Sequence, residues 1–255
     1  MAAKPHTPSC VLITGATGDF GKAFAARFAA LGCKLVLHGR DPKKLDAIAA
    51  EFSVPVHKIR FDITNRDDML DTLAKIPDEF FPDVLINNAG GAFGLDKAHE
   101  SRLEDWEAMI AINDTALVRV THAILPGMVK RQRGHIINIG STAGNYAYPG
   151  GNVYGAAKAF VKQFSLNLRS DLAGTKVRVT NLEPGQVETQ FSLARFKGDE
   201  ARAKAVYANT VSLTADDVAE AALWVATLPL HVNINRVEMM PTMQHIAGLT
   251  VERSA

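Results

Sequence analysis

The chain has 255 residues, of which 47% are hydrophobic, and a formal net charge of +1. Because Lys and Arg are spread out rather than clustered, the charge pattern argues against nucleic acid or a membrane surface as partner and favours small molecules. No apolar run approaches the roughly 18 residues of a membrane helix, and the start, MAAKPHTPSC, lacks a signal peptide's apolar core. We therefore expect a cytoplasmic protein. The scattered histidines and two isolated cysteines predict no metal site.

Strands and helices alternate along the whole chain. The expected strands are 10–14, 34–38, 56–61, 83–86, 135–139, 176–182 and 233–239, and the expected helices are 22–32, 43–52, 65–76, 103–131, 153–172 and 214–228. Because parallel strands joined by helices need right-handed crossovers, this pattern predicts an α/β fold with a Rossmann-type doubly wound seven-stranded parallel sheet. We expect a single domain over residues 10–255 after a loose N-terminal arm at residues 1–9.

The first strand runs directly into a glycine-rich turn, GATGDFG, and then into a helix. Such a turn binds dinucleotides because glycines let the backbone approach a pyrophosphate and the helix N-terminus offers unpaired N–H groups. The second strand ends in Gly39-Arg40, at the position that distinguishes NAD from NADP. Arg40 favours the 2′-phosphate of NADP, with a solvated loop charge as the alternative. Asp41 is expected to cap the next helix.

Other polar residues follow the third and fourth strands or interrupt a helix. Asp62 suits a hydrogen bond from adenine or a simple turn at the strand end. Asn88 lies at the carboxyl end of a strand, where ligands collect in open α/β sheets, and suits a cofactor or a bracing of the sheet. Asn113 lies inside a long helix, where Asn is unfavourable, and suits either function or helix bracing.

The stretch from Ser141 to Lys158 brings a hydroxyl, a phenol and an ammonium into one short window. Tyr154 and Lys158 are four apart at the start of an expected helix, so they share a face. A neighbouring ammonium lowers the pKa of a phenol, which makes Tyr154 a candidate general acid or base, although a lone Tyr-x-x-x-Lys also occurs on ordinary surface helices. Residues 186–213 are expected to be an irregular or weakly helical lid over the substrate.

In chain order these motifs resemble those of the short-chain dehydrogenase/reductase family. Residues 14–21 are similar to its T-G-x-x-x-G-x-G turn, with Asp19 in place of the middle glycine, and residues 87–90 are similar to its N-N-A-G. The resemblance extends to the catalytic tetrad and the P-G turn, at Asn113, Ser141, Tyr154, Lys158 and Pro184-Gly185. Within the family, several segments resemble NADP-dependent 3-hydroxy acid (serine) dehydrogenases and sulfoacetaldehyde reductases.

The resemblance implies a homotetrameric, NADP(H)-dependent enzyme that reduces a short aldehyde bearing an anionic group. Sulfoacetaldehyde and malonic semialdehyde are the two substrates implied, with oxidation of a 3-hydroxy acid such as serine as the reverse reaction. A non-catalytic NADP-binding redox sensor and a reductase of an unrelated small carbonyl compound are the alternatives. The complete tetrad argues against the sensor.

The resemblance also implies residue roles. Ser141 and Tyr154 would hold the carbonyl oxygen, Tyr154 would supply the proton, Lys158 would bind the nicotinamide ribose and lower the pKa of Tyr154, and Asn113 would hold a relay water. Asp19 is expected to cap its helix. The implied cofactor-binding residues are Gly15, Thr17, Gly18, Asp19, Phe20, Gly39, Arg40, Asp62, Ile63, Asn88, Ala89, Gly90, Tyr154, Lys158, Pro184, Gly185, Val187 and Thr189. The candidate substrate-binding residues are Ser141, Asn145, Tyr148, Asn152, Tyr154 and Gln186, with Arg195, Lys197 and Arg253 as candidate cations. The polar amide of Gln186 favours a sulfonate.

Overall fold

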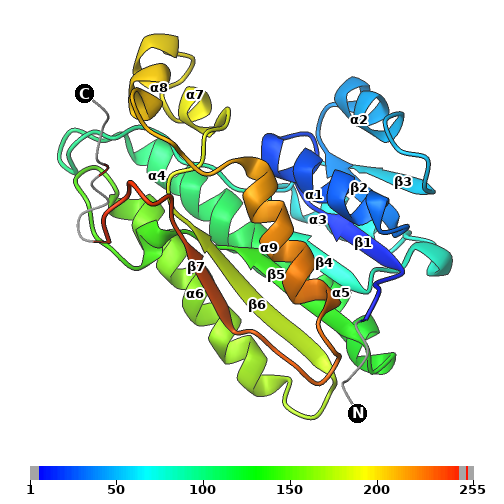
Figure 1. Cartoon of the computed structure of the whole chain (residues 1–255). Helices are drawn as coiled ribbons and strands as arrows, with labels where there is room; N and C mark the ends of the chain where they lie inside the picture. The colour runs from blue at the N-terminus through cyan, green and yellow to red at the C-terminus, as the bar shows by residue number, and fades with distance from the viewer. Residues whose placement is uncertain (1–5, 247–250, 252–255) are drawn as a thin grey trace.

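The computed structural model describes residues 6–246 and residue 251. Seven parallel strands form one central sheet with helices on both faces (Figure 1). The sheet order is β3-β2-β1-β4-β5-β6-β7, so the chain crosses the sheet between β3 and β4, which confirms the Rossmann-type doubly wound α/β fold as a single domain. The strands are β1 (Cys10–Ile13), β2 (Lys34–Gly39), β3 (Val56–Arg60), β4 (Val84–Asn87), β5 (Gly134–Ile139), β6 (Val177–Pro184) and β7 (Arg236–Met239).

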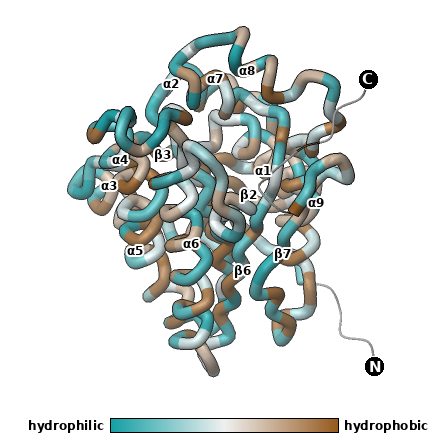
Figure 2. Tube along the Cα trace, turned by 90° about the vertical axis from the view of Figure 1, so that its left-hand side faces the viewer, coloured by the Kyte–Doolittle hydropathy of each residue, from teal (hydrophilic) through white to brown (hydrophobic). Residues whose placement is uncertain are grey.

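Alternating strand residues build two hydrophobic cores, one on each face of the sheet. Along β1, Val11 and Ile13 face the core under α1, α2 and α9, whereas Cys10 and Leu12 face the core under α3, α5 and α6. Hydrophobic and polar residues alternate along these helices, as expected when each buries one face (Figure 2). Their bounds are α1 (Asp19–Ala30), α2 (Pro42–Ala49), α3 (Arg66–Leu73), α5 (Ala116–Lys130), α6 (Asn152–Asp171) and α9 (Ala215–Thr227).

One long helix runs from Leu103 to Lys130, close to the predicted bounds. It consists of α4 (Leu103–Ile110), a π-helical turn (Ala111–Thr115) and α5. By length and hydropathy this helix would also suit a membrane span, but its α5 part packs in the core against the sheet, as core helices of soluble proteins do. The sequence pattern did not reveal the π-turn, which contains Asn113; such turns are frequent at functional sites.

Two predicted helix starts are confirmed. The Asp41 carboxylate accepts hydrogen bonds from the Lys43 and Lys44 N–H groups and caps α2. Thr214 and Asp217 form a reciprocal capping box at the start of α9. Both caps satisfy N–H groups that the helix itself leaves unpaired.

The predicted loose arm is wrong for residues 6–9, and residues 1–5 lie outside the described part of the chain. The His6 N–H donates to the carbonyl of Thr227 at 2.9 Å, and the Ser9 N–H donates to the Asp83 carboxylate at 2.8 Å. These contacts hold residues 6–9 against the amino-terminal edge of the sheet.

Residues 186–213, called the lid segment below, leave the end of β6 and return to the start of α9. A backbone bridge between Val187 and Leu213 closes the base of this segment. Between these ends lie the short helices α7 (Phe191–Arg195) and α8 (Glu200–Tyr207), which stand beyond the carboxyl end of β6 (Figure 1). Of the two alternatives expected for this segment, irregular or weakly helical, the structure shows the weakly helical one.

Candidate active site

The four residues of the expected tetrad come from three elements that converge at the carboxyl end of the sheet. Ser141 follows β5, Tyr154 and Lys158 lie on the first turns of α6, and Asn113 lies on the π-turn. Ser141 is near enough to Tyr154 for its hydroxyl to lower the pKa of the phenol. A Cβ atom added to Gly90 would lie 2.7 Å from Asn113 Oδ1 and 3.5 Å from Lys158 Nζ, so both side chains meet at this glycine. The structure thus brings all four residues together.

Asn113 connects the long helix to the loop that follows β4. Its amide nitrogen donates to the carbonyl oxygens of Gly91 at 2.8 Å and Met109 at 2.9 Å, and its oxygen accepts from the Gly91 N–H at 3.3 Å. The π-turn directs this 1%-exposed side chain inward. Bracing is therefore the role that the geometry shows.

Burial determines the protonation of the tyrosine and the lysine. Burial raises the pKa of Tyr154 well above its usual 10, Tyr148 adds to this, and Arg195 and Ser141 oppose it. Burial also lowers the pKa of Lys158 to about 8, against the opposing charge of Asp114. The Lys158 Nζ donates to the carbonyl of Ile139 at 2.9 Å and lies 5.7 Å from the centroid of the Tyr154 ring. The expected lowering of the Tyr154 pKa by Lys158 is not met in this arrangement, because the ammonium is directed to a backbone carbonyl.

The glycine turn has the geometry of an anion-binding cradle. Gly15 takes a left-handed φ of 64°, and its N–H donates to His38 Nδ1 at 3.1 Å. A Cβ atom at Gly21 would collide with the Gly15 carbonyl, so α1 packs this closely on the turn that follows β1 only because of this glycine. No side chain accepts from the first N–H groups of α1, whose N-cap is Gly18. These unpaired donors fit a dinucleotide diphosphate.

Asn88 braces this turn. Its amide nitrogen donates to the carbonyl oxygens of Thr14 at 2.8 Å and Gly15 at 3.1 Å. The Thr14 hydroxyl in turn accepts from the N–H groups of Asn88 and Ala89. Of the two roles left open for Asn88, bracing is the one that the structure shows.

Two arginines lie together at the ends of β2 and β3. Arg40 is exposed, and no side chain among the described residues forms a hydrogen bond or ion pair with its guanidinium. Arg60, in register with Gly39, donates from Nε to the Arg40 carbonyl at 3.1 Å. Arg60 was not among the residues expected from the sequence, although pairing of the two strand ends would have indicated it. Asp62 caps its own turn by accepting from the N–H and hydroxyl of Thr64, which lowers the pKa of Asp62.

The predicted cap at Asp19 is wrong. The Asp19 carboxylate makes no cap on α1, where it is the first residue. It accepts instead from the Gln190 N–H at 2.6 Å, at the start of α7. The glycine turn and the lid segment are joined by this bond.

Arg195 lies over Tyr154. From α7, its Nη2 donates to the Tyr148 hydroxyl at 3.0 Å and its Nε donates to the Gly94 carbonyl at 3.1 Å. The guanidinium carbon is 5.6 Å from the ring centroids of both Tyr148 and Tyr154. Of the other candidate cations, Lys197 is directed away to Asp105 at 2.7 Å, and Arg253 lies outside the described residues.

Asn152 and Tyr148 line a pocket of about 300 Å³ at the loop that joins β5 to α6, residues 140–151, which is called the catalytic loop below. Neither Ser141 nor Tyr154 lines this pocket. The Asn152 side-chain oxygen accepts from the N–H of the next residue, at the start of α6. Of these two substrate candidates, Tyr148 is the one connected to the tetrad, because its hydroxyl accepts a hydrogen bond from Arg195, which lies over Tyr154.

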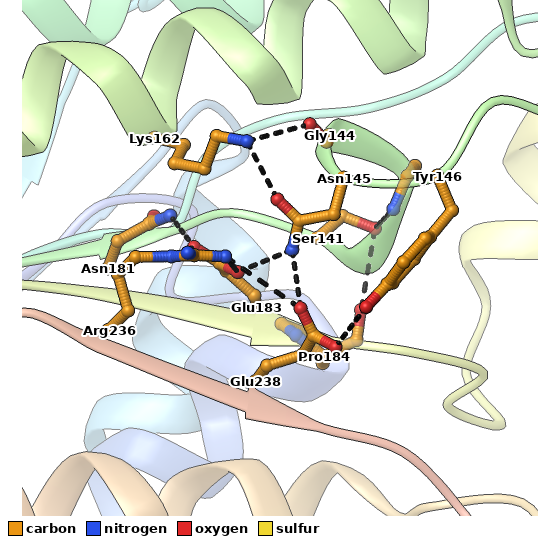
Figure 3. A network of polar contacts seen from close by, with 11 residues as sticks. Ser141, Gly144, Asn145, Tyr146, Lys162, Asn181, Glu183, Pro184, Arg236 and Glu238 are labelled. Atoms are coloured by element: carbon orange, nitrogen blue, oxygen red, sulfur yellow. Dashed lines mark hydrogen bonds and ion pairs between the residues drawn. The ribbon is translucent and has the colours of Figure 1, made fainter. Parts of the chain in front are cut away.

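Asn145 and Gln186 are both engaged elsewhere. The Asn145 amide nitrogen donates to the carboxylates of Glu183 and Glu238, each at 2.6 Å, and its oxygen accepts from Lys162 at 2.9 Å (Figure 3). This orientation removes Asn145 from the candidates for substrate contact. The Gln186 amide nitrogen donates to the carbonyl of Val206 inside the lid segment at 2.8 Å.

A buried carboxylate behind the catalytic loop organises this region, and the sequence analysis did not single it out. Glu183 is 1% exposed and receives two hydrogen bonds from Arg236, at 2.6 and 2.7 Å. Burial alone would raise the pKa of Glu183, but the bonds from Arg236 and Asn145 outweigh it and lower the pKa. Figure 3 shows Ser141 beside this network, where its hydroxyl donates to the Pro184 carbonyl at 3.4 Å. A glutamate directly before P-G in a buried strand was the signal available.

A family model described as short chain dehydrogenase matches residues 9–200. The chain belongs to this family. The NADP-dependent 3-hydroxy acid dehydrogenase of Salmonella typhi is 55% identical over 96% of this chain and 99% of that protein. The sulfoacetaldehyde reductase of Chromohalobacter salexigens is 49% identical over 96% of this chain and 99% of that protein. The closed form of serine dehydrogenase complexed with NADP⁺ superposes with a TM-score of 0.92 and 53% identity, covering 96% of this chain and all of that one. The family fold predicted from the motifs is confirmed, and the chain is an oxidoreductase of the short-chain type.

Proposed function

We propose that this short-chain dehydrogenase uses NADP(H) to reduce a short aldehyde carrying a carboxylate or sulfonate, and catalyses the reverse oxidation of the hydroxy acid. The placement of Arg195 carries the proposal, because it sets a cation over the catalytic tyrosine, in reach of an anionic group next to the reacting carbonyl. The names of the 3-hydroxy acid dehydrogenase and sulfoacetaldehyde reductase relatives support the same substrate class.

The cofactor proposal rests on the glycine turn and on Arg40. The unpaired N–H groups of α1 would hold the diphosphate, and the free guanidinium of Arg40, with Arg60 beside it, would hold a 2′-phosphate. Thr17, Phe20, Ile63, Val187 and Thr189 remain proposed cofactor contacts on the same basis of family resemblance. When bound, NADPH supplies the hydride.

The tetrad residues would manage the proton. Ser141 and Tyr154 hydrogen-bond the carbonyl oxygen, and Tyr154 transfers its proton as the oxygen gains charge. Tyr154 is protonated at neutral pH, the form that reduction needs, because the ordinary pKa of a phenol is already near 10 and burial raises it further. Lys158, whose lowered pKa makes it a ready proton carrier, would bind the cofactor ribose, and Asn113 would fix the loop on which a relay water rests.

Arg195 and Tyr148 would recognise the anion of the substrate. Arg195 leaves donors of its guanidinium beyond the two that bond Tyr148 and Gly94, and a guanidinium binds carboxylate and sulfonate alike. Because Gln186 is engaged inside the lid segment, its amide gives no reason to prefer the sulfonate. We therefore propose malonic semialdehyde and sulfoacetaldehyde as substrates without preference between them.

The test compares NADPH oxidation with malonic semialdehyde, sulfoacetaldehyde and uncharged propanal. Arg195→Met should lower kcat/KM for both anionic aldehydes by roughly 10- to 100-fold, because a charged hydrogen bond is lost, and should leave propanal within about 3-fold. Lys204→Met, on α8 of the same segment and paired only with Glu200 one turn earlier among the described residues, is the matched control and should leave all three nearly unchanged. Equal losses for charged and uncharged aldehydes in Arg195→Met would contradict the proposal.

We also propose a cytoplasmic homotetramer. Three large apolar side chains stand exposed on α4 and α6, where Leu103 is 63%, Ile110 47% and Phe160 42% exposed. Phe160 stacks on Phe164 with ring centroids 5.9 Å apart. These exposed apolar side chains, called the apolar face on α4 and α6 below, lie on two helices that contact each other and support association with a second copy. Free, buried Cys10 and Cys33 accord with a reducing compartment.

A further inference from the structure

The lid segment is held to the rest of the molecule mainly on its catalytic side. There the Gly94 N–H donates to the Arg195 carbonyl at 2.9 Å, and Lys197 forms its ion pair with Asp105. The ring of Phe191 packs on Tyr154 with centroids 5.7 Å apart. These contacts fix the outer part of the lid segment over the tetrad but leave its cofactor side to be held separately.

On the cofactor side the attachment is the hydrogen bond between Asp19 and Gln190. Within the described part of the chain, it is the one hydrogen bond between the glycine turn, residues 15–21, and the lid segment. Gln190 is the N-cap of α7, so the bond fixes the point at which the first lid helix starts. A glycine at position 19, as in the family's turn, has no side chain to make it.

The Asp19 carboxylate also belongs to a helix end that suits a bound anion. It sits on the first residue of α1, where the helix dipole and the unpaired N–H groups attract negative charge. A diphosphate bound at the same helix end would meet this carboxylate as a like charge. Asp19 is half-buried, so solvent screens the repulsion only in part.

We propose that Asp19 is a positioning residue that tethers the lid segment to the glycine turn and at the same time weakens cofactor binding by charge repulsion. The inference rests on the proposed function in one respect, namely that NADP(H) binds at this turn. By this proposal Asp19 affects binding of the aldehyde and binding of the cofactor in opposite directions. The tether favours a closed lid over the aldehyde, and the carboxylate opposes the cofactor diphosphate.

Two substitutions at one position separate the tether from the charge. Asp19→Gly restores the family residue and removes both, whereas Asp19→Asn keeps an acceptor oxygen of the same reach and removes only the charge. Asp67→Asn, in the exposed first turn of α3, makes the same change of net charge away from the site and serves as control.

Lid closure is read by backbone hydrogen exchange of residues 191–207 without cofactor, and cofactor affinity by fluorescence titration with NADPH without aldehyde. Asp19→Gly should exchange at least several-fold faster than wild type in the lid segment, and Asp19→Asn should stay close to wild type. Both variants should bind NADPH roughly 3- to 10-fold more tightly, because a like charge is gone. Asp19→Gly alone should raise the KM for the aldehyde.

Unchanged lid exchange in Asp19→Gly would overturn the tether, and unchanged or weaker NADPH binding in both variants would overturn the repulsion. Asp67→Asn reproducing either effect would do the same. Because exchange and affinity are measured without the aldehyde, a wrong substrate class would leave these results untouched, whereas absence of NADPH binding by the wild type would refute the proposed function itself.

Discussion

At the scale of single residues, burial places the lysine of the tetrad close to its titration point near neutral pH. Its pKa of about 8 lies below the usual 10.5, so Lys158 is charged below pH 8 and neutral above it. The ammonium is the proposed ribose ligand and proton carrier. NADPH-dependent reduction should therefore fall as the pH rises through about 8.

A pH profile of kcat/KM between about pH 6 and 10 checks this expectation. Lys158→Arg keeps a cation across that range and should remove the fall near pH 8, even at a lower overall rate. A wild-type profile that stays level through pH 8 and 9 would contradict the assigned pKa.

His38 makes stability depend on pH in the acid range. It is 2% exposed, its Nε2 bonds the Phe61 carbonyl and its Nδ1 accepts from Gly15, so only the neutral ring fits. Burial lowers the pKa of His38 to about 4, against 6.5 in the unfolded chain. Between pH 6.5 and pH 4 the unfolded chain binds a proton at His38 that the folded protein does not bind, and this favours unfolding. The contribution of neutral His38 to the free energy of unfolding is therefore complete above pH 6.5 and is lost as the pH falls toward 4.

The loss attributable to His38 is roughly 3 kcal/mol in the free energy of unfolding. Urea unfolding at pH 7 and pH 4.5 measures it. His135, also buried and neutral, contributes in the same direction, so the comparison is with His38→Asn, which keeps an acceptor for Gly15. The variant should lose less stability on acidification than wild type; an equal loss would show that His38 is not responsible.

At the scale of elements, the ion pair between Arg236 and Glu183 connects β7, β6 and the catalytic loop. Arg236→Met would leave the Glu183 carboxylate buried and unpaired, with only Asn145 and Asn181 as donors. We expect unfolding free energy to fall by about 2–3 kcal/mol, less than for a fully buried pair because Arg236 is 40% exposed.

Urea unfolding of Arg236→Met beside Arg66→Met gives the measurement and its control, since Arg66 lies 3.9 Å from an exposed Asp67 and should change stability little. The double variant with Glu183→Gln should recover part of the loss, because the buried charge is then absent. Equal free energies of unfolding for Arg236→Met and wild type would show that the ion pair between Arg236 and Glu183 does not stabilise the fold.

The sequence was sufficient for the elements whose cause is local. Seven apolar runs became seven strands, and Asp41 and Thr214 cap the helices that follow them, because capping depends on residues two or three apart. The side-chain directions at Asn145 and Asp19 were wrong for the opposite reason. Their partners, Glu183 and Gln190, lie 38 and 171 residues away, and nothing local indicates them. The π-turn at Asn113 was missed because one helical pattern continues across it.

At the scale of the whole molecule, the apolar face on α4 and α6 determines the expected assembly. Light scattering of the wild type in solution should give the mass of a tetramer. Phe160→Asp places a charge in the middle of this face and should shift the mass to smaller species.

The control is Leu31→Asp, at the end of α1, where the side chain is 37% exposed on another part of the surface and the mass should not change. A monomeric wild type, or a tetramer unaffected by Phe160→Asp, would contradict this use of the face.

Hydride transfer gated by proton donation from Tyr154 is the central claim, and single-turnover oxidation of bound NADPH by an anionic aldehyde tests it most directly. The wild type should consume one NADPH per site, whereas Tyr154→Phe should react roughly 100- to 10,000-fold more slowly, because a general acid is lost, and should still bind NADPH. A Tyr154→Phe rate within a few-fold of wild type would contradict the account.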